Sequence, residues 1–138
     1  MNAEQALKGS LEAFSAHDAD AFASFFAEGA SAYDPQYPEP LRGKDAIRKD
    51  IEDFITALPD LSARMLSLVG NSDVAAAEME ITGTHTGPFV TPEGTVPPTN
   101  KTLRMQVGLF VRVDGEGKIV ENNRYYDMMS VANQLGLS

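Results

Sequence analysis

The spacing of apolar residues changes once along this chain, near residue 61, and that change constrains the fold more than any other feature. Before it, apolar residues recur every three or four positions, which is the pattern of amphipathic helices. After it, apolar and polar residues alternate, which is the pattern of half-buried strands. Helices followed by a run of strands predict an α+β domain whose helices pack on one side of the sheet.

Capping residues and turn residues bound each of these elements. We expect a brief strand at Ala30–Asp34 and a last helix that begins at Met128, besides the main helices and strands. The main helices are expected over residues 2–16, 20–26 and 44–58, and the main strands over residues 62–69, 74–85, 102–113 and 119–126.

The connection over residues 86–100 is long for a segment between two strands. Connections of this length in compact domains are often lids or binding loops. Phe89 and Val90 lie within it, and both side chains favour burial over contact with water. We therefore expect this segment to fold over the rim of a pocket.

Length and charge limit the classes of function. With 138 residues, 43% of them hydrophobic, the chain can bury one good core, so we expect one domain over residues 1–138. Its formal net charge of -9 opposes binding to nucleic acids and to anionic membranes. The sequence shows neither an apolar run of roughly 20 residues nor the pattern of a secretory signal. We expect a cytoplasmic protein with no nucleic-acid or membrane partner.

Cysteine is absent from the chain, which excludes disulfides, thiolate nucleophiles and thiolate-bound metals. The two histidines, His17 and His85, are far apart and lack ligand spacing, so we expect no metal site. The sequence also has no glycine-rich phosphate loop and no nucleophile elbow. Any catalysis is therefore expected to be proton transfer without a cofactor.

The last expected strand carries polar and ionisable side chains on a face that should be apolar. With a period of two, Ile119, Glu121, Asn123, Tyr125 and Asp127 share one face. A violation of this kind indicates a functional site.

Three arginines, Arg104, Arg112 and Arg124, fall on the opposite faces of their strands, as do Glu78 and Glu80. Cross-strand ion pairs on an outer surface would account for all five side chains. An Asp-Arg-Asp hydrolytic set would need an arginine on the inner face, and a period of two places Arg104 outside unless a bulge reverses it.

Three separated motifs follow one another along the chain: residues 83–89 (GTHTGPF), residues 97–101 (PPTNK), and residues 117–121 (GKIVE) followed by Asp127. Together with the order of elements, they resemble the SnoaL-like polyketide cyclases of the nuclear-transport-factor-2-like superfamily. The resemblance covers nearly the whole chain. It implies a cone in which three N-terminal helices close over a curved, mostly antiparallel sheet with an interior pocket. It also implies a homodimer formed through the outer sheet face.

The resemblance implies that Asp127 is the acid/base, because a carboxylate at the matching position has this role in the cyclases. The alternative is that Asp127 only caps the helix that begins at Met128. His85 lies on the apolar face of its strand and is the second catalytic candidate, as a proton shuttle or as a group that orients Asp127. Its alternative is a structural hydrogen-bonding role.

Further side chains are expected to form the wall of a pocket that takes a small apolar ligand. Some are aromatic or sulfur-containing, and others could polarise a substrate carbonyl by hydrogen bonding. They are Tyr33, Asn123, Tyr125, Phe89, Met79, Met105, Phe54 and Phe14.

The leading hypothesis is a cofactor-free acid/base enzyme that acts on an apolar carbonyl-containing small molecule by aldol cyclisation or isomerisation. A second hypothesis is a non-catalytic ligand-binding or dimerisation module, because Asn123 and Asn100 stand where the family commonly has tryptophan and glycine. A third is an epoxide hydrolase, which would hold a water between inner-face carboxylate and amide or arginine groups. Asp127 with Asn123 could supply part of that set.

Overall fold

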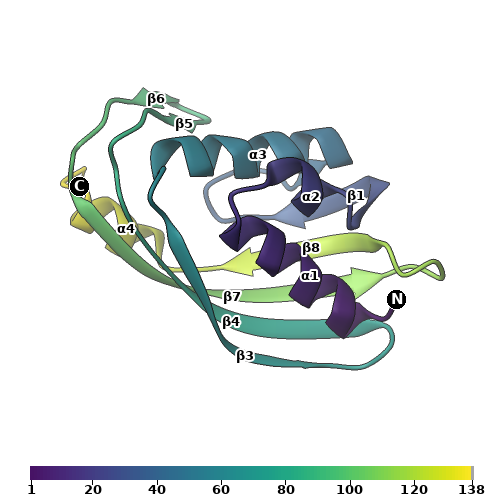
Figure 1. Ribbon diagram of the computed structural model, residues 1–138. Coiled ribbons are helices and arrows are strands. Elements are labelled where there is room, and N and C mark those ends of the chain that lie inside the picture. Colours follow the sequence, from purple (N-terminus) through teal and green to yellow (C-terminus); the bar gives the residue numbers. More distant parts are fainter. Residues whose placement is uncertain (138) are drawn as a thin grey trace.

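Helices on one side of a curved sheet make up the computed structural model, which describes residues 1–137 (Figure 1). This is the α+β arrangement that the change of period predicts. The helices are α1 (Ala3–Ser15), α2 (Ala19–Ala23), α3 (Lys44–Ala57) and α4 (Met128–Gln134). The strands are β1 (Phe26–Tyr33), β2 (Leu41–Arg42), β3 (Ser62–Gly70), β4 (Val74–Thr84), β5 (Phe89–Thr91), β6 (Gly94–Val96), β7 (Thr102–Val113) and β8 (Ile119–Tyr125).

The main sheet has the strand order β2-β1-β8-β7-β4-β3. Only the β1–β8 pair is parallel among the strands described, and the other neighbours are antiparallel. The long strands β3, β4 and β7 pass beneath α1 and α3 and curve upward toward α4 (Figure 1). The sheet therefore has a concave inner face, which the first three helices cover.

Alternating side chains place the core on this inner face. In β4, Ala75, Ala77, Met79 and Ile81 are buried while the residues between them are more exposed. Helix α1 adds its own buried stripe and begins with a capping box, in which Asn2 and Gln5 exchange hydrogen bonds. The helices and the sheet therefore pack their apolar faces against each other, as the periodicity of the sequence predicts.

The fourth helix is fastened to β7 by side-chain bonds to the backbone. The Gln134 side chain accepts a hydrogen bond from the Arg104 backbone nitrogen at 2.7 Å and donates one to the Arg104 carbonyl oxygen at 2.8 Å. Leu135, just beyond the helix, is buried in the core. Helix α4 thus closes the end of the cone that the first three helices leave uncovered.

Two expected boundaries differ from the structure. Strand β1 begins at Phe26, where the sequence predicts the end of a helix, because Phe26 pairs with Ile119 of β8. Tertiary pairing here outweighs the helical spacing of the aromatic residues. The long segment after β4 is not irregular throughout, since Phe89 pairs with Val96 and Thr91 with Gly94 to form a two-stranded hairpin.

A bulge in β8 changes which side chains face the core. Val113 pairs with Ile119 and Arg112 pairs with Glu121, so Val120 is an extra residue in this ladder. Beyond the bulge the buried positions are Asn122 and Arg124, one residue out of step with Ile119.

The bulge overturns two predictions about this strand. Arg124, predicted on the outer surface, is buried. Tyr125, predicted on the inner face, is 54% exposed. A one-residue insertion reverses the two faces of a strand. A prediction that assumes strict alternation therefore assigns the residues after the bulge to the wrong faces.

None of the helices within residues 1–137 is long and apolar enough to cross a membrane.

Gly87 offers a test of how closely the β5–β6 segment is held against α3. Its backbone nitrogen donates a hydrogen bond to the Ala57 carbonyl oxygen, and a methyl group at Gly87 would overlap the Thr56 carbonyl oxygen. We predict that Gly87→Ala lowers the free energy of unfolding by about 1–3 kcal/mol, measured by denaturant titration. Gly29→Ala is the control, because a methyl group there meets nothing within 4 Å. Equal effects of the two substitutions would contradict this packing.

Candidate functional site

A cavity of about 500 Å³ lies between the helices and the inner face of the sheet. Its wall is mostly apolar and includes side chains from α1, α3, β4, β7, α4 and the β5–β6 hairpin. Five of the predicted wall residues take part in it: Phe14, Phe54, Met79, Phe89 and Met105. Phe54 holds the hairpin against α3 through an edge-on contact with Phe89, with ring centroids 6.0 Å apart.

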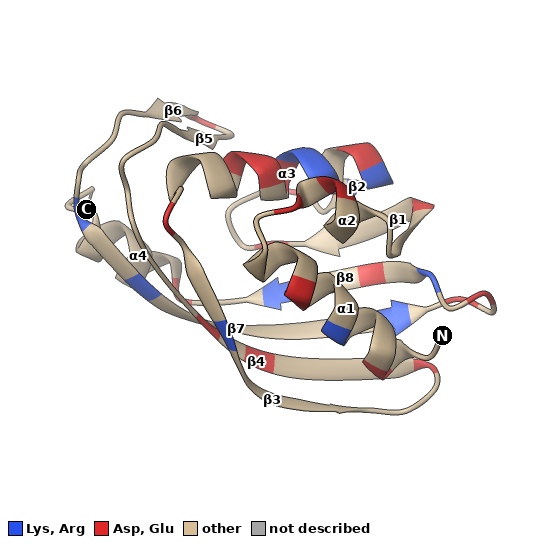
Figure 2. Cartoon of the chain, viewed as in Figure 1, with Lys and Arg blue, Asp and Glu red and all other residues tan. Residues whose placement is uncertain are grey.

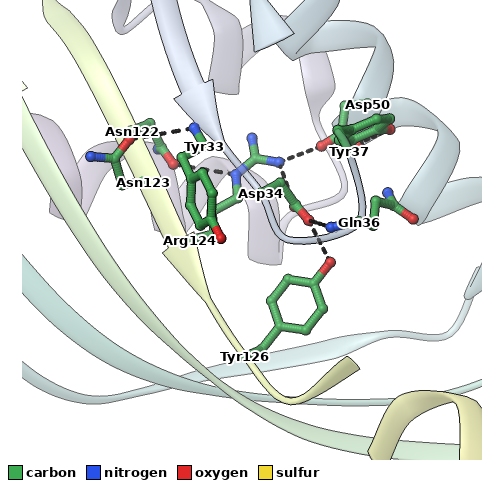
Figure 3. Close-up of polar contacts among 9 residues, drawn as sticks. All are labelled: Tyr33, Asp34, Gln36, Tyr37, Asp50, Asn122, Asn123, Arg124 and Tyr126. Carbon is green, nitrogen blue, oxygen red and sulfur yellow. Dashed lines mark hydrogen bonds and ion pairs between the residues drawn. The ribbon is translucent and has the colours of Figure 1, made fainter. Parts of the chain in front are cut away.

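A charged cluster interrupts this apolar wall (Figure 3). The guanidinium Nη1 of Arg124 donates hydrogen bonds to Asp34 Oδ2 at 3.2 Å and to Asp50 Oδ2 at 2.5 Å. The three side chains are only 7–8% exposed. We call Asp34, Asp50 and Arg124 the Asp-Arg-Asp cluster.

Each member of the cluster comes from a different element. Asp34 directly follows β1, Asp50 lies on the buried stripe of α3 beside Ile47 and Ile51, and Arg124 lies on β8 beyond the bulge. The cluster therefore joins β1, α3 and β8 through side chains that are far apart in the sequence.

Neutral donors complete the hydrogen bonding of the two carboxylates. The Tyr126 hydroxyl donates to Asp34 Oδ1 at 2.5 Å, and the Gln36 backbone nitrogen donates to the same oxygen at 3.0 Å. The Tyr37 hydroxyl donates to Asp50 Oδ1 at 2.6 Å. Both tyrosines are partly buried, and Tyr126 lines the cavity, as do both aspartates.

The surroundings keep these donors protonated. Burial raises the pKa of Tyr126 far above its usual value, and the charge of Asp34 raises it further. Burial and the charge of Asp50 likewise raise the pKa of Tyr37. Burial alone would lower the pKa of Arg124, but the charges of Asp50 and Asp34 outweigh burial and the pKa is raised. Arg124 therefore stays cationic and both tyrosines stay neutral donors near neutral pH.

This arrangement can perform proton transfer. Two carboxylates in a sheltered cavity can accept a proton from a bound molecule, and Tyr126 can donate a hydrogen bond to an oxygen that becomes negative. Within residues 1–137, no group of three histidine or acidic side chains is placed to hold a metal ion.

Asp127 lies outside the cavity wall. It is exposed and caps α4, where its Oδ1 accepts a hydrogen bond from the Ser130 backbone nitrogen at 3.0 Å. The structure thus places Asp127 in the role of helix cap, the alternative that the sequence left open.

The polar wall residues predicted near Asp127 also lie elsewhere. Tyr33 and Tyr125 are exposed and pack against each other, with ring centroids 5.4 Å apart. The Asn123 side-chain oxygen accepts a hydrogen bond from the Tyr33 backbone nitrogen at 3.4 Å. These three side chains follow the face that the bulge turns outward, and the cavity wall does not include them.

His85 is fully buried but does not line the cavity. Its Nδ1 accepts a hydrogen bond from the Thr99 backbone nitrogen at 3.3 Å and lies 3.0 Å from Thr99 Oγ1. Its backbone nitrogen donates to the Lys101 carbonyl oxygen, and its carbonyl oxygen accepts from the Asn100 backbone nitrogen. His85 therefore joins the two ends of the segment that carries the β5–β6 hairpin, and this contact is structural.

The Asp-Arg-Asp cluster was not predicted from the sequence, although one of its members breaks a sequence pattern. Asp50 stands on the apolar stripe of α3, three residues after Ile47 and four before Phe54, where a charged residue is unexpected. Arg124 was not predicted because the bulge in β8 reverses the face on which its side chain lies. Asp34 follows a short strand and shows no pattern by itself.

The Asp-Arg-Asp cluster predicts a large difference between two arginine substitutions. Arg124→Leu leaves two buried carboxylates without their shared cation, so we expect the free energy of unfolding at pH 7 to fall by about 3–5 kcal/mol. Arg104→Leu removes a 69% exposed arginine from Glu80, which keeps its ion pair with Arg64, and should cost less than about 1 kcal/mol. Denaturant titration of both variants measures this difference. Similar losses of unfolding free energy would show that the buried ion pairs of Arg124 contribute no more to stability than an exposed one.

His85 predicts a pH dependence of stability. Burial lowers the pKa of His85, so the folded state binds this proton less readily than the unfolded chain does. We expect the contribution of neutral His85 to the free energy of unfolding to be complete above about pH 6.5, the pKa in the unfolded chain. It should decline as the pH falls toward the lower pKa of the folded state. In denaturant titrations at about pH 7 and pH 5.5, His85→Asn should lose less stability on acidification than the unsubstituted protein. A parallel decline would contradict this assignment.

Solved structures share this fold. A candidate SnoaL-like polyketide cyclase from Jannaschia sp. CCS1 superposes with a TM-score of 0.81 at 15% identity, over 97% of this chain and 93% of that one. A protein with a ketosteroid isomerase-like fold from Catenulispora acidiphila gives a TM-score of 0.77 at 17% identity, over 99% and 96%. SalBIII, described as an epoxide hydrolase/cyclase-like enzyme in pyran ring formation in the polyether salinomycin, gives 0.73 at 17% identity, over 91% of each chain. These similarities confirm the predicted cone-shaped fold.

Sequence comparison gives the family. No curated protein matches this sequence. The model of the SnoaL-like polyketide cyclases matches residues 4–135, which is nearly the whole chain. The chain therefore belongs to the SnoaL-like polyketide cyclase family.

Proposed function

We propose that this protein is a cofactor-free acid/base enzyme that acts on a mostly apolar, carbonyl-containing small molecule by aldol cyclisation or isomerisation. The observation that carries the proposal is the Asp-Arg-Asp cluster in the wall of an otherwise apolar cavity. The family match supports the same class of reaction.

The cost of burying this cluster supports a functional role. Three charged side chains less than a tenth exposed lose most of their hydration, and ion pairing often fails to recover that loss. Apolar side chains of similar size could fill the same space at lower cost. Active sites are places where such arrangements are retained because the chemistry requires them.

Asp34 is the side chain that we assign as the base. Its carboxylate lines the cavity beside the Tyr126 hydroxyl, so one group can take a proton while the other stabilises charge. In the proposed step, the Tyr126 hydroxyl turns from Asp34 toward the substrate oxygen, Asp34 removes a proton from the carbon next to the carbonyl, and the enolate oxygen accepts the hydrogen bond from Tyr126. The enolate carbon then attacks a second carbonyl or is reprotonated, and the proton returns from Asp34 to the product.

Arg124 and Asp50 hold this base in place. Arg124 bonds to the Asp34 oxygen that Tyr126 does not contact, and Asp50 anchors Arg124 from α3. Neither residue needs to change its protonation during the step. They position Asp34 within the cavity.

A second candidate reaction is epoxide opening, which the shared guanidinium favours. Asp34 and Asp50 contact the same nitrogen of Arg124, so a proton on one carboxyl could go to the epoxide oxygen while the other takes a proton from the nucleophile. SalBIII, which has the same fold, is described as epoxide hydrolase/cyclase-like. The inner-face arginine that this reaction needs is Arg124 rather than Arg104.

The assignment predicts opposite results for two aspartates that undergo the same substitution. Asp34→Asn should slow turnover by at least about 100-fold because it removes the base. Asp127→Asn should change turnover only a few-fold, because asparagine also caps helices. The measurement is deuterium exchange at the α-carbon of apolar ketones in D₂O, with β-tetralone as the first, followed by proton NMR.

Circular dichroism and denaturant titration show whether each variant is folded. Exchange retained in a folded Asp34→Asn variant would rule out Asp34 as the base. Hydrolysis of styrene oxide, measured on the same proteins, tests the second reaction. Activity toward the epoxide without exchange in the ketones would favour epoxide opening over the aldol step.

A further inference from the structure

We infer that the cavity takes an uncharged ligand and discriminates against organic anions, and that Glu93 at its rim adds to this selectivity. The inference rests on the proposal that the cavity binds the substrate. It goes further by specifying the charge of that substrate.

The charges of the cavity wall carry the inference. Among the described residues that line the cavity, the acidic and basic side chains are those of Asp34, Asp50, Glu93 and Arg124. Counted as formal charges at pH 7, they sum to -2. An anionic group on a ligand would therefore enter a wall that is already negative.

Arg124 cannot offset this charge for a ligand. Its Nη1 bonds to both carboxylates, and its Nε donates to Asn122 Oδ1 at 3.3 Å. Its Nη2 has no hydrogen-bond partner among the described residues, but it is enclosed by protein and exposes less than 1 Å² of surface. A ligand in the cavity therefore meets a guanidinium whose unpaired nitrogen is out of its reach.

The rest of the wall gives an anion little compensation. Most lining side chains are aliphatic or aromatic, including Leu11, Ile51, Phe54, Met79 and Val107. A sulfonate or carboxylate would give up its hydration for contact with these surfaces. A neutral ligand of the same shape has no such cost.

Glu93 occupies a different position from the two aspartates. It lies in the turn between β5 and β6, is exposed, and borders the cavity mouth. Figure 2 shows an acidic residue in this turn and acidic residues in the β7–β8 turn at the other end of the molecule. Because solvent and salt screen an exposed charge, Glu93 should modulate the selectivity while the buried pair sets it.

Two fluorescent probes with the same ring system test the inference. N-phenylnaphthylamine is neutral, and anilinonaphthalenesulfonate adds one sulfonate to the same rings. We expect the neutral probe to bind with a Kd at least about tenfold lower, which corresponds to about 1.4 kcal/mol. Equal or tighter binding of the sulfonate would overturn the inference, as would a failure of both probes to bind.

A matched pair of variants separates the rim charge from the overall charge of the protein. Glu93→Gln and Glu116→Gln each remove one exposed carboxylate, but Glu116 lies in the distant β7–β8 turn. At low salt, we expect the Kd of the sulfonate probe divided by that of the neutral probe to be two- to fivefold smaller in Glu93→Gln than in the unsubstituted protein. The effect should be this modest because solvent and salt screen an exposed charge. The ratio should be unchanged in Glu116→Gln. The same narrowing in both variants would show that Glu93 has no specific part.

Methionine methyl NMR locates the bound probe without further substitutions. Met79 and Met105 line the cavity, whereas Met1 and Met129 are 67% and 72% exposed. The neutral probe should shift the first two methyl resonances, and shifts confined to Met1 or Met129 would contradict binding in the cavity. These readouts need no turnover, so they can fail independently of the deuterium-exchange test of the proposed function.

Discussion

The ion pairing of Arg124 with Asp34 and Asp50 is the interaction on which the candidate site depends. It joins the end of β1, the middle of α3 and the far half of β8, and each contact spans more than 70 residues of sequence. Two carboxylates could not be buried together without a shared cation, because their mutual repulsion and lost hydration would favour protonation or exposure. Arg124 therefore permits acidic side chains in a cavity that is otherwise lined by apolar ones.

The pairing depends in turn on the bulge at Val120. Without the extra residue, the alternation that buries Ile119 would turn Arg124 toward the outer surface and Tyr125 toward the core. Tyr126 would also move to the outer side and could not donate to Asp34. A local irregularity in one ladder thus selects which set of polar side chains the cavity receives.

Much of the fold could be predicted from the sequence, and the reason is periodicity. Strand β7 matches its expected range of Thr102–Val113, and α3 matches to within one residue, because apolar spacing reports burial directly. The start of β1 at Phe26 was missed because its pairing with Ile119 is a tertiary contact. The β5–β6 hairpin was missed because its strands are short and prolines surround them.

Apolar periodicity also predicts most of the apolar wall of the cavity, but it does not predict the Asp-Arg-Asp cluster. Phe14, Phe54, Met79 and Met105 could be predicted because each belongs to an apolar pattern, and Phe89 because its side chain favours burial over contact with water. The cluster depends on pairing between distant segments and on a bulge, and only Asp50, a charge within an apolar stripe, left a trace in the sequence. Asp127 was a catalytic candidate because it follows the last strand. In the structure its carboxylate accepts a hydrogen bond from the backbone of the next helix and caps that helix.

The pairing that permits a buried base also limits what the cavity can bind. A guanidinium that was free to meet a ligand would attract anions, but it would then leave Asp34 and Asp50 without their counter-charge. Because Arg124 Nη1 is committed to both carboxylates and Nη2 is enclosed by protein, the cavity gains a group that can accept a proton and offers a ligand little positive charge. The proposed chemistry and the proposed preference for uncharged ligands therefore follow from one interaction.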